Sequence, residues 1–300
     1  MSRTIVLFTL CVVVGCAMNN DAPPYTDQPR ISPNGLILTG VALDGIRPAG
    51  VTLNGVAPAG TASTGGVISI AAGAPLAGAG LVGSRWTGHL SDGRTLMLRI
   101  DAAAQGSSPN DDLWSYQVSA LTGTTWWPVC RDAAGAPGFA DSVHGTWNLA
   151  QGVPGGGAYH PTDSDFTLAC RGSAVSKCIE LGYKPWSGAG RPLAACTRAM
   201  RAEFCGDGRP FTVDGTLVNI YDIGGVLPDG VAWAVEAEWT ADGAGCVSDR
   251  ESTRFWQTVH QTPWCYLQTF TTRNSCGAGD FGEVITELPP RAGLVDLVAR

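Results

Sequence analysis

Arg94-Thr-Leu-Met-Leu-Arg-Ile100 alternates polar and apolar residues, so Leu96, Leu98 and Ile100 share one face of an extended chain. A period of two predicts a half-buried β-strand, because successive side chains in a strand point to opposite faces of the sheet. The same alternation recurs in Trp114-Ser-Tyr-Gln-Val118 and Val231-Ala-Trp-Ala-Val-Glu-Ala-Glu-Trp239. All three segments are therefore predicted to be strands.

Turn signals recur along the same part of the chain. Five Asp-Gly pairs begin at Asp92, Asp207, Asp214, Asp229 and Asp242. This dipeptide tolerates the positive φ angles of tight hairpin turns. The sequence therefore predicts a mainly β, β-rich α+β fold built from antiparallel strands.

A single short helix is expected near residues 192–205. Its apolar stripe consists of Leu193, Cys196, Thr197, Met200 and Phe204. Pro192 suits a first helical turn, and Gly206 is typical of the residue that ends a helix. Arg198 and Arg201 fall on another face.

The cysteines indicate a disulfide framework. Beyond Cys11 and Cys16, the chain contains Cys130, Cys170, Cys178, Cys196, Cys205, Cys246, Cys265 and Cys276. An even number of cysteines is typical of disulfide-bonded domains in oxidising compartments, and the spacings match no zinc motif. We therefore expect no metal site.

Two expectations concern the pairing of these cysteines. Nine residues of continuous helix rise about 13.5 Å, too far for Cys196 to bond Cys205. Each should instead attach the helix to a different neighbouring strand or loop. We expect Cys130 to pair with Cys170 at two adjacent strand ends, and the other pairings stay open.

The N-terminus carries an export signal. Arg3 precedes an apolar run from Ile5 to Val14, which is about the length of a signal-peptide core and roughly half of a membrane span. Val13-Val14-Gly15-Cys16 resembles the lipobox of bacterial lipoproteins. The resemblance implies a signal peptide over 1–15 and a lipid on Cys16, whereas an ordinary signal peptide with a chance cysteine is the alternative.

The residue after the lipobox and the segment that follows it indicate where in the cell envelope the protein is held. In lipoproteins, Ala17 in place of Asp favours the outer membrane. Residues 16–34 are polar and proline-containing, as expected of an extended tether. The prediction is an outer-membrane lipoprotein of the cell envelope.

Glycine recurs every five residues across 35–65. This stretch partly resembles pentapeptide-repeat proteins, with branched Val or Ile at positions that are usually small. About six units are too few to bury their own core, since repeat architectures need roughly three stacked repeats. An ordered stalk or cap and a low-complexity linker remain equal alternatives.

A longer resemblance begins near Leu81. Lys177-Cys-Ile-Glu-Leu-Gly-Tyr-Lys-Pro-Trp186, Ala195-Cys-Thr-Arg-Ala-Met-Arg-Ala-Glu-Phe-Cys-Gly-Asp-Gly208 and Thr212-Val-Asp-Gly-Thr216 resemble the ADYC domain family. Ala202-Glu203-Phe204-Cys205 stands where that family has Ala-Asp-Tyr-Cys. The resemblance covers roughly Leu81 to the mid-200s. It supports a disulfide-rich β domain, predicted over 81–300, in an envelope protein, and it transfers no catalytic residue.

Several function classes find no support in the sequence. The four histidines are scattered without an HExxH setting, and no nucleophile elbow, phosphate-binding loop or dinucleotide fingerprint occurs. We therefore expect no cofactor and assign no catalytic residue. A net charge of −7 gives no basic surface for nucleic acid.

Two functional hypotheses remain open. The first is a non-enzymatic interaction or structural module, held at the membrane by its lipid and contacting an envelope protein or polysaccharide. The second is a carbohydrate-binding or hydrolytic protein with a carboxylate site around Asp207 and Asp222. Tryptophans in predicted loops, at Trp126-Trp127, Trp186 and Trp264, suit stacking on sugars or proteins, although packing in the core is the simpler role.

Overall fold

The computed structural model describes residues 53–56, 61–64, 67–72, 74–90, 95–132, 134–162, 166–213, 215–266 and 276–290. Residues 1–15, Cys16, the tether, Asp92, Asp214 and most of the glycine repeat lie outside these ranges. Within them, no helix has both the length and the apolar character needed to cross a membrane.

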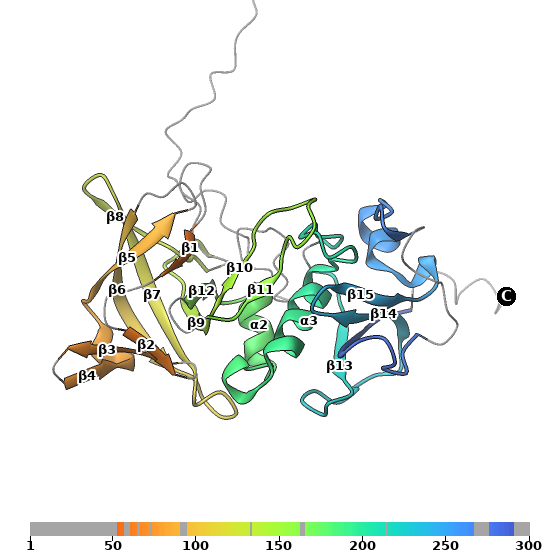
Figure 1. Cartoon of the computed structure of the whole chain (residues 1–300), viewed down its shortest axis with the longest axis horizontal. Helices are drawn as coiled ribbons and strands as arrows, with labels where there is room; N and C mark the ends of the chain where they lie inside the picture. Colours follow the sequence, from red (N-terminus) through yellow and green to blue (C-terminus); the bar gives the residue numbers. More distant parts are fainter. Residues whose placement is uncertain are drawn as a thin grey trace, which may run out of the picture.

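A closed ring of antiparallel strands forms one end of the molecule (Figure 1). The sheet runs in the order β6-β5-β1-β12-β9-β7-β8, and an additional β6–β7 pairing closes its first six strands on themselves. The strands are β1 (Leu53–Val56), β5 (Arg85–Leu90), β6 (Thr95–Gln105), β7 (Trp114–Thr122), β8 (Thr125–Pro128), β9 (Ala140–His144) and β12 (Phe166–Cys170).

The two strands predicted in this part of the chain are β6 and β7, so these predictions are confirmed. Leu98 lies opposite Ala120, and Ile100 lies opposite Val118. All four side chains are buried, in a core that also contains Trp86 and Phe166. The alternating pattern therefore reports the inner face of the ring.

A second sheet forms the other end, in the order β13-β16-β14-β15, with every pair antiparallel. Its strands are β13 (Asn219–Asp222), β14 (Ala234–Thr240), β15 (Gly243–Val247) and β16 (Val284–Leu288). The strand predicted over 231–239 begins three residues late, at Ala234. Asp242-Gly243 lies at the turn between β14 and β15, where Thr240 pairs with Gly243.

Helices α2 (Ala174–Glu180) and α3 (Gly190–Arg201) lie between the two sheets (Figure 1). The strand-rich, antiparallel fold class is as predicted, but α2 was not expected. It has seven residues, about two turns, which is too short for a helical period to stand out in the sequence. The hydroxyl of Ser173 caps it by accepting from the Ser176 amide at 3.2 Å.

Helix α3 ends earlier than the sequence suggests. Its last residue is Arg201, and Ala202 turns the chain with φ 52° in the left-handed region. The predicted end near 205 is therefore wrong, and Phe204 and Cys205 lie in the loop beyond the helix. Helices often end on such a left-handed residue, usually glycine, so an alanine in this role gave no signal.

Shorter elements complete the fold. Two small antiparallel sheets consist of β2 (Thr61–Thr64), β3 (Val67–Ala72) and β4 (Ala74–Ala77), and of β10 (Thr146–Trp147) and β11 (Tyr159–His160). Single turns of helix occur at η1 (Gly78–Leu81), η2 (Pro185–Ser187) and η3 (Arg250–Ser252), and η4 (Phe255–Val259) is a π-helix. The glycine repeat contributes β1 and β2.

All eight cysteines beyond Cys16 form disulfides: Cys130–Cys170, Cys178–Cys196, Cys205–Cys265 and Cys246–Cys276. The first is the bridge expected from the sequence. Cys196 attaches α3 to α2, not to a strand or loop as expected, because the unforeseen helix packs directly against α3. Cys205 attaches the loop after α3 to a segment sixty residues later.

Candidate functional site

Ala202, Glu203 and Phe204 are buried and Cys205 is half-buried, and this segment supports the fold. Glu203 accepts a hydrogen bond from Arg198 Nη1 at 2.5 Å and also pairs with Arg201. All three side chains are at most 2% exposed. Burial lowers the pKa of Arg201, and the negative charge of Glu203 opposes that shift. One carboxylate therefore compensates two arginines that leave the end of α3.

The remaining residues of the segment also point into the core. The Phe204 ring packs against Phe211, Trp239 and Phe255, with centroids 6.3, 4.9 and 5.1 Å away. Cys205 is bonded to Cys265. The segment joins α3, the four-stranded sheet and η4 and offers no reactive group to solvent.

The glycines at 155–157 lie against this segment and support it. Gly156 accepts a hydrogen bond from Arg198 Nη1 at 2.5 Å through its carbonyl oxygen. A Cβ on Gly157, which has φ 73°, would lie 2.3 Å from Glu203 Oε2. Only glycine permits this close approach of the backbone to the buried ion pairs.

The carboxylates suggested as a hydrolytic or sugar-binding site are each bonded to different groups. Asp207, 2% exposed, accepts from Trp264 Nε1 at 2.9 Å and from the Arg209 amide at 3.1 Å. Asp222 accepts from the Tyr183 hydroxyl at 3.0 Å and, at 3.1 and 2.6 Å, from the amides of the loop that follows β13. Burial, together with the charge of Asp222, raises the pKa of Tyr183. The bonds of both carboxylates hold local structure.

One group of possible metal ligands occurs among the described residues: Glu238, Cys246 and Cys276. The two sulfur atoms are bonded to each other, so neither is a free thiolate. Glu238 accepts from the amides of Gly277, Gly279 and Phe281 at 2.5, 3.1 and 2.7 Å. The cluster therefore holds the loop before β16 in place.

The four tryptophans singled out from the sequence differ in their surroundings. Trp126 lies under Arg99, whose guanidinium carbon is 4.5 Å from the ring centroid, and Trp127 packs against the core of the ring. Trp186 donates to Asp112 Oδ2 at 2.8 Å and is partly buried. Trp264 is 56% exposed.

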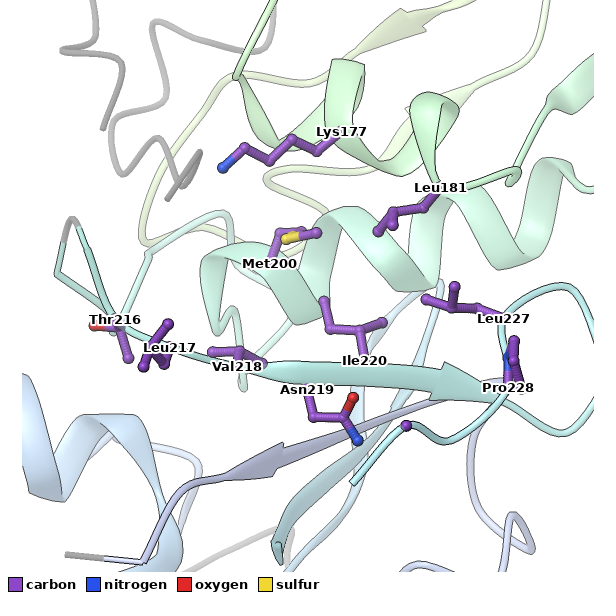
Figure 2. Close-up of a pocket in the computed structure, with 11 residues that line it drawn as sticks. Lys177, Leu181, Met200, Thr216, Leu217, Val218, Asn219, Ile220, Leu227 and Pro228 are labelled. Carbon is purple, nitrogen blue, oxygen red and sulfur yellow. The ribbon is translucent and has the colours of Figure 1, made fainter. Parts of the chain in front are cut away.

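An apolar cavity of about 360 Å³ lies beside α3. Figure 2 shows Lys177 and Leu181 from the α2 region on one side, Met200 of α3 in the middle and the chain of β13 on the other side. The lining consists of Lys177, Leu181, Met200, Thr216, Leu217, Val218, Asn219, Ile220, Leu227, Pro228 and Gly230. Its volume falls within the range of roughly 300–1,000 Å³ typical of small-molecule sites.

The side chains that line the cavity are mostly aliphatic, and one of them is a cation. Leu217 at its edge is 56% exposed, whereas Met200 and Ile220 at its floor are both 7% exposed. Lys177 carries the only charged side chain of the lining, and its ammonium nitrogen is shielded from solvent. The cavity is chemically suited to an aliphatic chain with an acidic end.

Sequence reasoning did not identify this cavity. Lys177 belongs to the stretch that resembles the family and Met200 to the apolar stripe of the helix, whereas Leu217 belongs to no motif. A signal was present in Leu217-Val218-Asn219-Ile220, an apolar run between two turn-forming Asp-Gly pairs. Which other segments meet that run depends on long-range packing.

Comparison with known proteins agrees with the family resemblance. The model of the ADYC domain matches residues 78–253. No curated protein and no solved structure matches the chain. The matched region contains every strand of the ring except β1, together with both helices and the segment Ala202–Cys205, and covers more than half of the sequence. The chain belongs to the ADYC domain family.

Proposed function

We propose that this protein is a lipid-anchored, non-enzymatic binding module on the extracytoplasmic side of the cell envelope. A lipid on Cys16 attaches it to the outer membrane. Its cavity beside α3 takes a fatty acyl chain with an acidic head group. The cavity is the observation that carries the binding role.

The location is supported by two independent features of the chain. The apolar run that ends in Gly15-Cys16 has the length and sequence of a lipoprotein signal. The described domain contains four disulfides, and disulfides persist in oxidising compartments outside the cytoplasm.

The binding role is supported by the lining of the cavity. Six aliphatic side chains surround it, an aliphatic residue at its edge is exposed, and its one charged group is the Lys177 ammonium. An acyl chain would bury the exposed edge of Leu217, at roughly 25 cal/mol per Å² of apolar surface removed from water. A carboxylate on that chain complements the positive charge of Lys177.

Binding is favoured over hydrolysis because the candidate carboxylates hold local structure. Asp207 accepts hydrogen bonds from the Trp264 indole and from the Arg209 amide. Asp222 accepts two hydrogen bonds from amides of its own loop and one from the Tyr183 hydroxyl. Neither carboxylate lines the cavity.

The anchor is tested by Cys16→Ala in the native host. We expect the variant to leave the membrane fraction and to lose the diacylglyceryl mass from its N-terminus. Cys11→Ala is the matched control, because Cys11 lies in the predicted signal peptide, and it should stay lipidated and membrane-bound. An unmodified Cys16 in the wild-type protein would refute the anchor.

The cavity is tested with dansyl-undecanoic acid, whose fluorescence rises in an apolar site. Leu217→Asp should weaken binding about tenfold or more, whereas Val153→Asp, at an exposed aliphatic residue (44%) outside the lining, should leave it unchanged. Lys177→Gln should weaken binding of the acid but not of its methyl ester. Absence of binding to the wild-type protein, or equal binding by Leu217→Asp, contradicts the proposal.

A further inference from the structure

Among the described Phe, Tyr and Trp side chains, Trp264 alone is mostly exposed to solvent, at 56%. Single exposed apolar side chains are common on protein surfaces, so the exposure of this ring assigns no role by itself. The other described tryptophans are buried or partly covered. Trp264 therefore differs from the tryptophans that serve the core.

The position of the Trp264 ring is fixed by two attachments. Its Nε1 donates to Asp207 Oδ2 at 2.9 Å, and the acceptor carboxylate is buried. Its neighbour Cys265 is bonded to Cys205, and Pro263 on the other side is buried. The ring is held at its edge, and about half of its surface stays in water.

Both attachments lead to the buried family segment. Cys205 is the last residue of Ala202–Cys205, and Asp207 follows two residues later. That region is held by Glu203 and its two arginines and by the close contact of Gly206 with the β14–β15 turn, where a Cβ would lie 1.9 Å from the Asp242 carbonyl oxygen. A rigid part of the core therefore supports the exposed ring.

The residues that precede the ring in the chain are polar: His260, Gln261 and Thr262 are all exposed. Arg209, whose amide donates to Asp207, is also exposed. Apolar protein-binding centres are instead enclosed by contacts that exclude water. An exposed flat ring in a polar stretch of chain suits a pyranose sugar, whose C–H face stacks on an indole while its hydroxyls bond polar groups.

We propose that Trp264 is a stacking platform for a pyranose unit of an envelope polysaccharide, with Asp207 as the positioning residue that holds its ring. Because the ring is already ordered, binding loses little side-chain freedom, which favours affinity. This site is separate from the cavity beside α3, whose lining contains neither residue. If Trp264 binds no sugar, the proposal for an acyl chain in the cavity is unaffected. If the cavity binds no acyl chain, the proposal for Trp264 is likewise unaffected.

Co-sedimentation of the purified full-length protein with peptidoglycan sacculi, and binding to purified lipopolysaccharide, test the platform. We expect at least one glycan to bind and Trp264→Ala to reduce that binding about tenfold. Trp264→Phe keeps a flat ring but loses the N–H donated to Asp207, so it should retain an intermediate affinity. The glycan that binds identifies the source of the sugar.

Trp186→Ala is the matched control, since that indole also donates to a carboxylate, Asp112, at another site. It should bind like the wild-type protein. Thermal unfolding should show that Trp264→Ala is folded, because the ring is mostly in water. The proposal is overturned if the wild-type protein binds neither glycan, or if Trp264→Ala binds as well as the wild-type protein.

Discussion

Arg254 donates through Nε to both carboxylate oxygens of Glu236, at 3.0 and 2.9 Å, and neither side chain is exposed to solvent. The same guanidinium donates to the carbonyl oxygens of Ala199 and Met200 at 2.5 and 3.1 Å. The last carbonyls of a helix have no partner within the helix. Arg254 therefore satisfies the end of α3 from a segment more than fifty residues later and ties it to β14.

Arg254→Met should destabilise the protein by about 3–5 kcal/mol, because it leaves the buried Glu236 charge without its partner. Urea denaturation measures the loss. Arg191→Met, which breaks the Arg191–Glu283 pair at an arginine 70% exposed, should cost less than about 1 kcal/mol. Equal losses for the two variants would contradict the role assigned to Arg254.

Glu203→Gln should also destabilise the protein by several kcal/mol, about 3–5, since Arg198 and Arg201 would lose their shared negative charge. Glu203→Asp keeps that charge, and the family tetrad has Asp at this position, so it should cost less. Chemical denaturation of the two variants side by side decides the matter. A Gln variant as stable as the Asp variant would show that the charge is unimportant.

Stability should depend on pH through Asp141. Burial raises the pKa of its carboxyl to about 6, although the Ser115 and Ser176 hydroxyls donate to it and Arg171 lies 3.9 Å away; the nearby Glu180 adds to the rise. In the unfolded chain the value is near 3.8. The folded state therefore binds the proton more tightly between about pH 4 and 6.

The unfolding free energy should accordingly fall as pH rises through that window, by about 3 kcal/mol from this group. Below it the carboxyl is neutral in both states, and above it the charged form carries the full penalty of burial. Asp141→Asn should flatten this part of the pH profile in urea titrations. Parallel profiles for the wild-type protein and the variant would refute the assignment.

The Cys205–Cys265 bridge closes sixty residues, whereas Cys178–Cys196 closes eighteen. Constraint of the unfolded chain gives about 4 kcal/mol for the longer loop and about 3 kcal/mol for the shorter. Replacing both members of each pair by Ala should show this order in denaturation experiments. Cys205→Ala with Cys265→Ala should also release the Trp264 loop, detectable as faster proteolysis there.

The sequence by itself determined the features that depend on neighbouring residues. Alternation at Leu96, Leu98 and Ile100 predicted β6 because side chains two apart share a face. The even cysteine count predicted disulfides, and the stretch through Cys205 indicated the ADYC family. Such signals are local or compositional, so one chain suffices to read them.

The tertiary structure alone decided the rest. Helix α3 ends at Arg201 because Arg254 meets its carbonyls and Ala202 adopts a left-handed conformation. Asp207 bonds Trp264 because the Cys205–Cys265 bridge brings distant segments together. These pairings depend on which surfaces pack against each other across the fold. Contacts between segments fifty or more residues apart leave no periodic pattern in the sequence, so they cannot be predicted from it.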